Sequence, residues 1–174
     1  MGKCISLCNK PIVNVNELQN VNELQNVNEL QNVNELQNVN DDTIQLFSLD
    51  KQIYPAKIVR VYDGDTCFAV FKLHNEYVKF KIRMEGYDSP EMKPSLENKN
   101  REKEKKYAQK AKEELEKHVL NKIVSLHCGK WDKYGRLLGT IYTNVNSANV
   151  NINELMIKNG FGYAYDGGTK KEFK

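Results

Sequence analysis

The residues best placed to do chemistry lie in one short stretch, residues 82–91, Ile-Arg-Met-Glu-Gly-Tyr-Asp-Ser-Pro-Glu. Arg83 ends a segment of alternating apolar and polar residues, and the carboxylates of Asp88 and Glu91 follow within the next turn. A cation on a strand beside a pair of acids is suited to hold a phosphate group next to a hard metal ion. The alternative is structural, because the residues around Pro90 also suit the first turn of a helix.

Two distant stretches carry matching chemistry. Residues 63–66 are Asp-Gly-Asp-Thr, and residues 131–136 are Trp-Asp-Lys-Tyr-Gly-Arg. The first supplies carboxylates, which hard cations prefer, and the second supplies another planar guanidinium that matches phosphate geometry. Each stretch alone is typical of a turn with a structural glycine. The three together favour a common phosphate-binding site over three unrelated turns.

Short elements must position these turns, and alternating hydrophobic patterns predict where the strands lie. In the strand that ends at Arg83, Lys79 and Lys81 share a basic face with the arginine, whereas the residues between them are apolar. Asp63 and Gly64 are typical of a hairpin turn between the first two strands. The expected strands are residues 54–62, 66–73, 77–84, 123–128 and 136–142.

Two helices are expected beside the strands. One covers about residues 100–120, and a short one begins after Asn151 as its N-cap and ends at Gly160. These elements indicate an α+β fold that is mainly β, a five-stranded OB-type Greek-key barrel with a helix between strands three and four and a short helix after strand five. The buried stripe of the longer helix is expected to be Tyr107, Ala108, Ala111, Leu115 and Val119.

The three polar stretches, in this order and with these spacings, resemble the staphylococcal nuclease family across roughly residues 50–166. The resemblance implies that Asp65 and Asp88 bind calcium through their carboxylates and that Ser89 binds it through its backbone carbonyl. Serine at position 89 replaces the threonine of the best-known members, which is harmless if the main chain supplies the oxygen.

The same resemblance implies the catalytic groups. Glu91 matches the general base for the attacking water, and Arg83 and Arg136 match the guanidinium groups that grip the scissile phosphate. Contacts to the rest of the substrate are implied for Lys133, Tyr134, Tyr163 and Tyr165.

The expected activity is calcium-dependent hydrolysis of DNA and RNA phosphodiesters, with single strands favoured, little sequence preference and 3′-phosphate ends. No obligate protein partner is predicted. The alternative is a non-catalytic module on the same barrel that binds nucleic acid or a protein. Such copies in the family typically lose the acids or arginines, and this chain keeps them.

Composition agrees with a polyanionic partner. The chain has 174 residues, enough for one ordinary domain and an appendage. Residues 1–44 hold two lysines against six acids, whereas the whole chain has a formal net charge of +3. The basic charge therefore lies in residues 45–174. No segment resembles a membrane span or a secretory signal, and the cysteines lack zinc-type spacing, so an intracellular location is expected.

Residues 1–10 fit an acylation signal. Gly2 with Ser6 matches the acceptor pattern for N-myristoylation, and Cys4 and Cys8 are placed for palmitoylation. Two acyl chains would hold the protein stably at the cytoplasmic face of a membrane. A chance match in a chain that is never acylated is the alternative.

Residues 15–38 are four copies of Val-Asn-Glu-Leu-Gln-Asn. Apolar residues recur at every third position, a period that does not keep to one face of an α-helix. We expect residues 11–44 to be a disordered low-complexity spacer with transient helix, which precedes a nuclease-like domain of residues 45–174. A membrane-tethered adaptor that works through the repeats is a third hypothesis, and it rests on the N-terminus alone.

Overall fold

The computed structural model describes residues 31–145 and 148–168. These residues divide into two units between Phe47 and Ser48. The predicted lipidation sites Gly2 and Cys4 lie outside the described residues and stay predictions. In the described ranges, no helix combines the length and the apolar character needed to cross a bilayer.

The first unit contains the end of the repeats. Residues 31–37 are helical, and the short 3-10 helix η1 covers Asp41–Thr43. Val33, Leu36 and Val39 are all at least half exposed. The repeat helix therefore buries no continuous apolar face, in keeping with its period of three residues.

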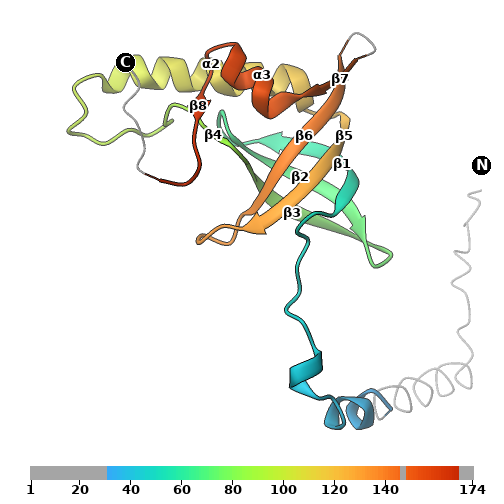
Figure 1. Cartoon of the computed structure of the whole chain (residues 1–174). Coiled ribbons are helices and arrows are strands. Elements are labelled where there is room, and N and C mark those ends of the chain that lie inside the picture. Colours follow the sequence, from blue (N-terminus) through green and yellow to red (C-terminus); the bar gives the residue numbers. More distant parts are fainter. Residues whose placement is uncertain (1–30, 146–147, 169–174) are drawn as a thin grey trace, which may run out of the picture. The chain divides into compact units, whose positions relative to one another are not determined.

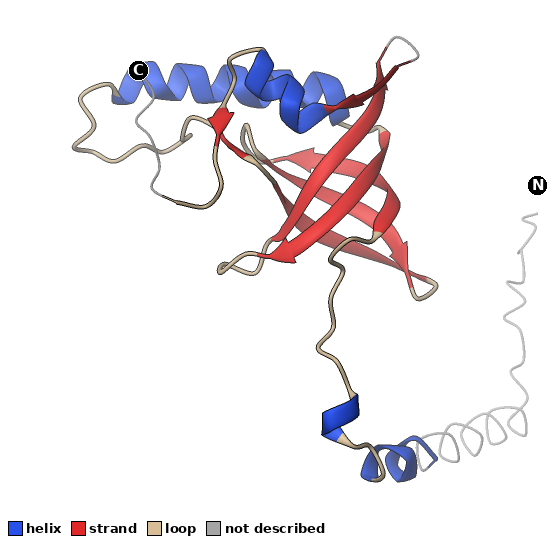
Figure 2. Ribbon diagram, viewed as in Figure 1, coloured by secondary structure: helices blue, strands red, loops and turns tan. Residues whose placement is uncertain are grey.

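The second unit is a closed five-stranded barrel, which confirms the expected OB-type architecture (Figure 2). Strands β1, β2 and β3 form an antiparallel meander, β5 pairs with β1, and β6 pairs with β5. A parallel pairing of Ile82, Arg83 and Met84 in β3 with β6 closes the barrel. The strands are β1 Ile53–Val61, β2 Thr66–Leu73, β3 Glu76–Met84, β5 Ile123–Trp131 and β6 Leu137–Val145.

Smaller strands complete the sheet and the site. Strand β7, Ala148–Asn151, extends the sheet beside β6. Strands β4, Tyr87–Asp88, and β8, Tyr163–Ala164, form a separate antiparallel pair. None of these three strands was predicted from the sequence, and β5 and β6 extend beyond their predicted ends at residues 128 and 142.

The barrel forms where the sequence alternates. Inward residues such as Ile58, Ala69, Ile82, Leu126 and Ile141 are fully buried, and their neighbours face outward. The residues of the β2–β3 loop, His74 and Asn75, both have positive φ, which matches the primed turns of two-residue hairpins. Cys67 in β2 and Cys128 in β5 are free and buried.

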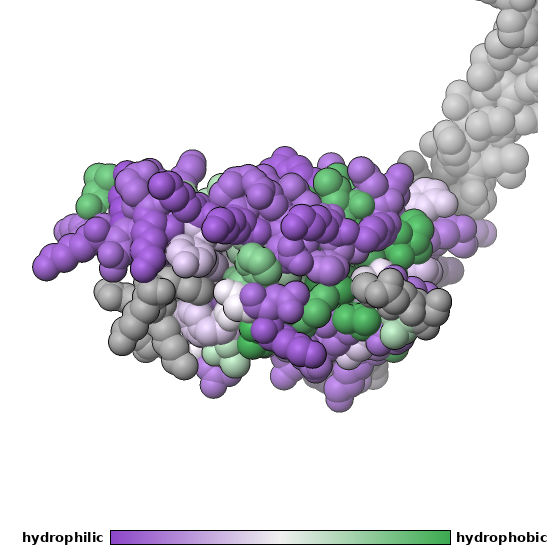
Figure 3. Space-filling model, turned by 90° about the horizontal axis from the view of Figure 1, so that it is seen from above, coloured by the Kyte–Doolittle hydropathy of each residue, from purple (hydrophilic) through white to green (hydrophobic). Residues whose placement is uncertain are grey.

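Helix α2, Arg101–Val119, lies with helix α3, Ile152–Lys158, over one end of the barrel (Figure 1). The predicted stripe of α2 is confirmed for Ala108, Ala111, Leu115 and Val119 but is wrong for Tyr107, which is 47% exposed. Glu104 is buried instead, because its carboxylate meets donors from the preceding loop. The outer face of α2 is largely hydrophilic (Figure 3).

Helix α3 is fixed at both ends and to the barrel. Asn151 accepts a hydrogen bond from the Glu154 N–H as the predicted N-cap, and Gly160, with φ of 77°, follows the helix. Asn153, buried inside, donates to the carbonyls of Glu85 and Gly139 and accepts from the Ile141 N–H. This amide ties α3 to the strand end that leads into the polar turn at residue 88.

Candidate active site

One cleft of about 1040 Å³ brings the predicted chemistry together. The turn between β1 and β2, the end of β3, strand β4 and the β5–β6 loop all contribute to its walls. The segment around β8 forms the remaining side. Every predicted site residue in the second unit lines it, namely Asp65, Arg83, Asp88, Ser89, Glu91, Lys133, Tyr134, Arg136, Tyr163 and Tyr165.

Asp65 accepts several hydrogen bonds inside the cleft. Its Oδ2 accepts from the Ser89 N–H at 2.8 Å and from the Ser89 hydroxyl at 2.7 Å, and its Oδ1 accepts from the Thr66 hydroxyl at 2.9 Å. Asp65 is only 6% exposed, and these donors supply the hydrogen bonds that a buried carboxylate needs and fix it in one orientation. The backbone and hydroxyl of Ser89 thus join the first turn to the second. Metal binding through the Ser89 carbonyl stays a prediction.

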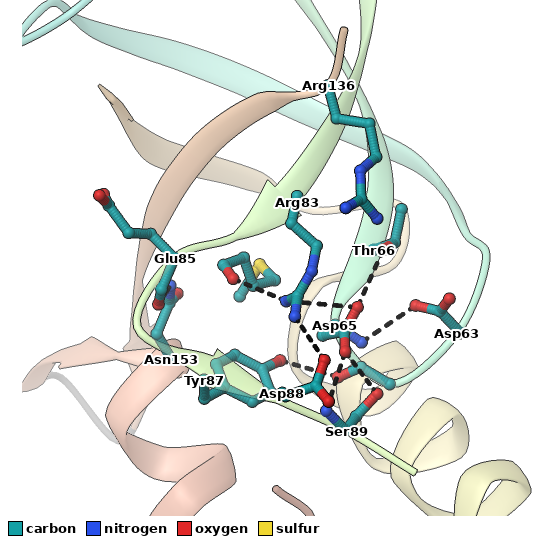
Figure 4. A network of polar contacts seen from close by, with 12 residues as sticks. Asp63, Asp65, Thr66, Arg83, Glu85, Tyr87, Asp88, Ser89, Arg136 and Asn153 are labelled. Carbon is teal, nitrogen blue, oxygen red and sulfur yellow. Dashed lines mark hydrogen bonds and ion pairs between the residues drawn. The ribbon is translucent and has the colours of Figure 1, made fainter. Parts of the chain in front are cut away.

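Arg83 lies between two buried acids (Figure 4). Its Nη2 donates to Asp88 Oδ1 at 2.7 Å, and its Nη1 lies 3.3 Å from Asp65 Oδ1. Nη1 also donates to the Met84 carbonyl at 2.9 Å. This guanidinium therefore holds both carboxylates at the end of β3, where the sequence predicted a phosphate contact.

Asp63 adds a third acid that the sequence analysis left without a role. Burial, together with the charge of neighbouring Asp65, raises the pKa of Asp63 to about 6. Its Oδ1 accepts from the Asp65 N–H at 3.2 Å. The signal was present in the sequence, because Asp63 and Asp65 flank one glycine in a tight turn.

Arg136 approaches the cleft from the β5–β6 loop. Its Nε donates to Asp132 Oδ2 at 2.6 Å, and Asp132 Oδ1 accepts from the Tyr134 and Arg136 N–H groups. Partial burial raises the pKa of Asp132, but these hydrogen bonds outweigh it and leave the pKa below its ordinary value. Asp132 therefore orients Arg136, a role that the sequence analysis did not assign.

Lys133 and Tyr134 lie exposed in the same loop. The Lys133 ammonium is 5.1 Å from the centroid of the Tyr134 ring, and the Arg136 guanidinium carbon is 5.6 Å from it. The loop therefore presents two cations around one aromatic ring at the edge of the cleft, which suits the predicted contacts with a phosphate outside the scissile bond.

Glu91 lies exposed at the rim of the cleft, and its backbone is held from α2. The Glu91 N–H donates to Glu104 Oε1 at 3.1 Å, while Glu104 Oε2 accepts from the Asn98 amide at 2.6 Å. The buried carboxylate of Glu104 thus joins Glu91 to the loop that follows it. No sequence pattern pointed to this contact.

The two tyrosines after α3 differ in their contacts. The Tyr163 hydroxyl donates to Asp88 Oδ2 at 3.0 Å, whereas the Tyr165 hydroxyl donates to the Gly168 carbonyl. Their rings contact edge to face with centroids 6.3 Å apart. Tyr163 therefore holds an acid of the site, and a substrate contact by either ring stays a prediction.

Close packing explains two further residues. A Cβ at Gly64 would lie 2.7 Å from the Ala111 Cβ and 2.8 Å from the Ser89 Cβ, so this glycine is needed for space. The predicted hairpin between β1 and β2 is confirmed, but the φ of Gly64 is not positive, so the turn needs this glycine for space rather than for a left-handed backbone. Tyr87, fully buried, donates its hydroxyl to the Gly64 carbonyl at 2.7 Å. Gly64 and Tyr87 therefore hold the turn of residues 63–65 closely against α2 and β4.

The donor set fits a hard divalent cation. Asp65 and Asp88 place two carboxylates on the single guanidinium of Arg83, so this group already carries one excess negative charge, and Asp63 lies beside Asp65 in the same cleft. Burial is the main cause of the raised pKa of Asp63, and repulsion from the Asp65 carboxylate adds to it. Among the described residues, no three or more His, Cys, Asp or Glu side chains already form a metal cluster. Carbonyl and water oxygens would therefore complete the shell.

Comparison with known proteins agrees with this geometry. The profile of the staphylococcal nuclease homologue family matches residues 81–174. An uncharacterized protein of Methanocaldococcus jannaschii is 32% identical over 130 residues, which cover 64% of this chain and 59% of that protein. Staphylococcal-like nuclease CAN1 of Arabidopsis thaliana is 33% identical over 101 residues, which cover 56% of this chain and 27% of that protein.

An uncharacterized endonuclease of Escherichia coli is 26% identical over 110 residues, which cover 63% of this chain and 60% of that protein. The chain thus spans less than two thirds of the length of each of these relatives. The family profile nevertheless covers more than half of the chain, including Arg83, Asp88, Glu91 and Arg136. The chain belongs to the staphylococcal nuclease homologue family.

Proposed function

We propose that this protein is a calcium-dependent nuclease that hydrolyses DNA and RNA phosphodiesters with low sequence specificity and leaves 3′-phosphate ends. One observation carries the proposal. A single cleft gathers two arginines, the two carboxylates of Asp65 and Asp88, which suit a cation, and a further carboxylate, Glu91, at its rim. These are the groups that attack by water on an anionic phosphodiester requires.

The residues divide the reaction between them. Glu91 takes a proton from the attacking water, whose oxygen bonds to phosphorus as the bond to the 5′ oxygen breaks. The 5′ oxygen takes up a proton from solvent, so the products are a 3′-phosphate and a 5′-hydroxyl. Arg136 and Arg83 donate hydrogen bonds to the phosphoryl oxygens as their charge grows. Calcium, held by Asp65, Asp88 and main-chain oxygen, would supply charge neutralisation at the phosphate.

The direct test is degradation of single-stranded DNA and of RNA by the purified chain, with calcium and with excess chelator. We expect cleavage with calcium, a loss on chelation, recovery on adding calcium back, and products that become substrates for polymerase only after their 3′ phosphates are removed. A folded chain that binds nucleic acid but cuts nothing under either condition would instead be a binding module.

Glu104 gives a prediction about positioning. Glu104→Gln replaces an acceptor with an amide that cannot satisfy both the Glu91 N–H and the Asn98 amide. We expect kcat to fall about 10-fold to 100-fold with little change in KM, because the base is displaced rather than removed. Glu102→Gln, on the exposed side of the same helix, is the matched control. Equal kcat values in both variants would show that Glu104 only stabilises the fold.

Asp63 gives a prediction about pH. Its pKa is about 6 when folded against 3.8 in the ordinary carboxyl, so the folded state holds the proton more tightly. In chelator, the free energy of unfolding should therefore decrease as the pH rises from about 4 to about 6, by up to about 3 kcal/mol in total. Urea unfolding of the wild type and of Asp63→Asn measures this difference across that range.

Calcium should reverse the effect, because a cation beside Asp63 favours its charged form. We expect calcium to stabilise the wild type more at pH 7 than at pH 5. The Asp63→Asn variant should show a flatter dependence on pH in chelator. Parallel unfolding curves for the two proteins across this range would contradict the assignment of the titration to Asp63.

A further inference from the structure

Strands β1, β2 and β3 lie side by side in the barrel (Figure 1), and their outward-facing side chains are largely basic and aromatic. Apart from Glu76 at the hairpin, the residues of these three strands include no acid. We call this surface the basic face, and define it by Lys57, Arg60, Tyr62, Phe68, Lys79 and Lys81.

The sheet register places these residues in rows. Arg60, Phe68 and Lys81 are neighbours across the three strands, and Lys57, Val70 and Lys79 form the next row. Alternate residues along a strand lie about 7 Å apart on the same side. The cations are therefore spread in two dimensions over the face rather than gathered at one point.

Cations lie over the rings of Phe68, in the first row, and of Tyr62, which directly follows β1. The Arg60 guanidinium carbon is 4.7 Å from the Phe68 centroid and 5.9 Å from the Tyr62 centroid, and the Lys81 ammonium is 4.7 Å from the Tyr62 centroid. Tyr62 is 45% exposed, and Phe68 is half-buried. These rings are accessible on an outer barrel surface, where an apolar core cannot explain them.

The basic face continues into the proposed active site. Lys81 borders a second hollow together with Glu91, Tyr134, Gly135 and Arg136. Two residues further along β3 lies Arg83, which binds Asp65 and Asp88 inside the cleft. A strand of nucleic acid that leaves the cleft past Glu91 and Arg136 would therefore meet Lys81 first, and then Phe68 and Arg60 in the same row.

From this arrangement, and resting on the proposed nuclease function, we infer that the basic face binds the part of a single-stranded nucleic acid that extends beyond the cleft. Lysine and arginine contact successive phosphates, and the rings of Tyr62 and Phe68 stack on unpaired bases. Bases in a duplex are already stacked and cannot lie on these rings. The occupant is therefore a single strand, and the surface favours long substrates over short ones.

The test measures binding, so that it does not depend on cleavage. Fluorescence anisotropy would follow a labelled single-stranded oligonucleotide bound to the full chain in chelator, over a series of salt concentrations and strand lengths. Tyr62→Ala and Phe68→Ala should each weaken binding about 5-fold to 150-fold. Lys57→Gln with Lys79→Gln should lower the salt slope by about 0.7 for each lost phosphate contact.

The control removes the same charge elsewhere. Lys106→Gln with Lys110→Gln, on the exposed side of α2, should leave both affinity and salt slope nearly unchanged. Thermal unfolding of each variant checks that the barrel is intact. The losses in the basic-face variants should grow with strand length and should be smaller for a duplex of the same sequence.

The outcomes separate the two proposals. If the wild type binds through the basic face but cleaves nothing with calcium, the nuclease function fails and the inference stands. If the wild type cleaves but the basic-face variants bind long strands as tightly as the α2 control does, the inference is overturned. Equal losses for single strands and duplexes on removing Tyr62 or Phe68 would overturn the stacking contact.

Discussion

Replacement of Arg136 by alanine is expected to slow cleavage of single-stranded DNA by about 100-fold to 1,000-fold. Arg136 reaches the cleft with its Nε bound to Asp132 at 2.6 Å, so the guanidinium is already oriented before substrate arrives. An oriented donor stabilises the growing charge on phosphate without reorganising during the reaction. The loss should appear mainly in kcat, because the donor matters most in the transition state.

Two further variants test whether the planar guanidinium of Arg136, rather than its charge alone, is needed for cleavage. Arg136→Lys keeps the charge but loses the planar pair of donors, and we expect it to recover only part of the rate. Arg101→Ala removes a guanidinium outside the cleft, where it lies 3.6 Å from Glu102, and should cut at close to the wild-type rate. A near-normal rate for Arg136→Ala would remove this arginine from the mechanism.

The Arg136→Ala variant tests the role of a guanidinium in catalysis more directly than Arg83→Ala does, because Arg83 also stabilises the fold. Arg83→Ala would leave Asp65 and Asp88 buried without their shared cation, which is costly to the fold by itself. Its loss of activity would combine chemistry with instability, whereas Arg136 pairs with the partly exposed Asp132. A calcium titration of Arg83→Ala would be informative, since a divalent ion could compensate for the missing guanidinium.

The sequence could predict the barrel and the meeting of the three polar turns because both depend on local signals. Period-two alternation marks the inward face of each strand, as Ile58, Ala69 and Ile82 show. Alternate strands of an antiparallel meander run in the same direction, so the residues after β1 and after β3 lie at the same end of the sheet. Only the family resemblance predicted that the β5–β6 loop belongs to the same site, because this loop is far along the chain from the other two polar turns.

The contacts that support the site could not be predicted, because they join residues far apart in the chain. Tyr163 binds Asp88 across 75 positions, through strands of only two residues that leave no periodic pattern. In α2, Glu104 and Tyr107 both border the apolar stripe, and hydrophobicity favours the tyrosine. Glu104 is the residue that is buried, because the Glu91 N–H and the Asn98 amide need a hydrogen-bond acceptor at this place.

Glu91→Gln is expected to reduce the rate of cleavage by about 100-fold to 10,000-fold while the protein still binds nucleic acid and calcium. The amide has nearly the same shape as the carboxylate but cannot take a proton from water. The backbone hydrogen bond to Glu104 is unaffected by the change, so the turn should keep its position. Single-turnover cleavage, with binding measured separately, distinguishes lost chemistry from lost affinity.

The dependence on pH makes this test specific to a base. Without Glu91, cleavage must use hydroxide from solution, so the residual rate should rise about tenfold for each pH unit over a range where the wild type levels off. Glu97→Gln, which changes an exposed acid in the same loop, should behave like the wild type. If Glu91→Gln cut at a near-normal rate, the base would have to be another acid of the cleft. Asp63, whose pKa lies near 6, would then be the carboxylate to replace.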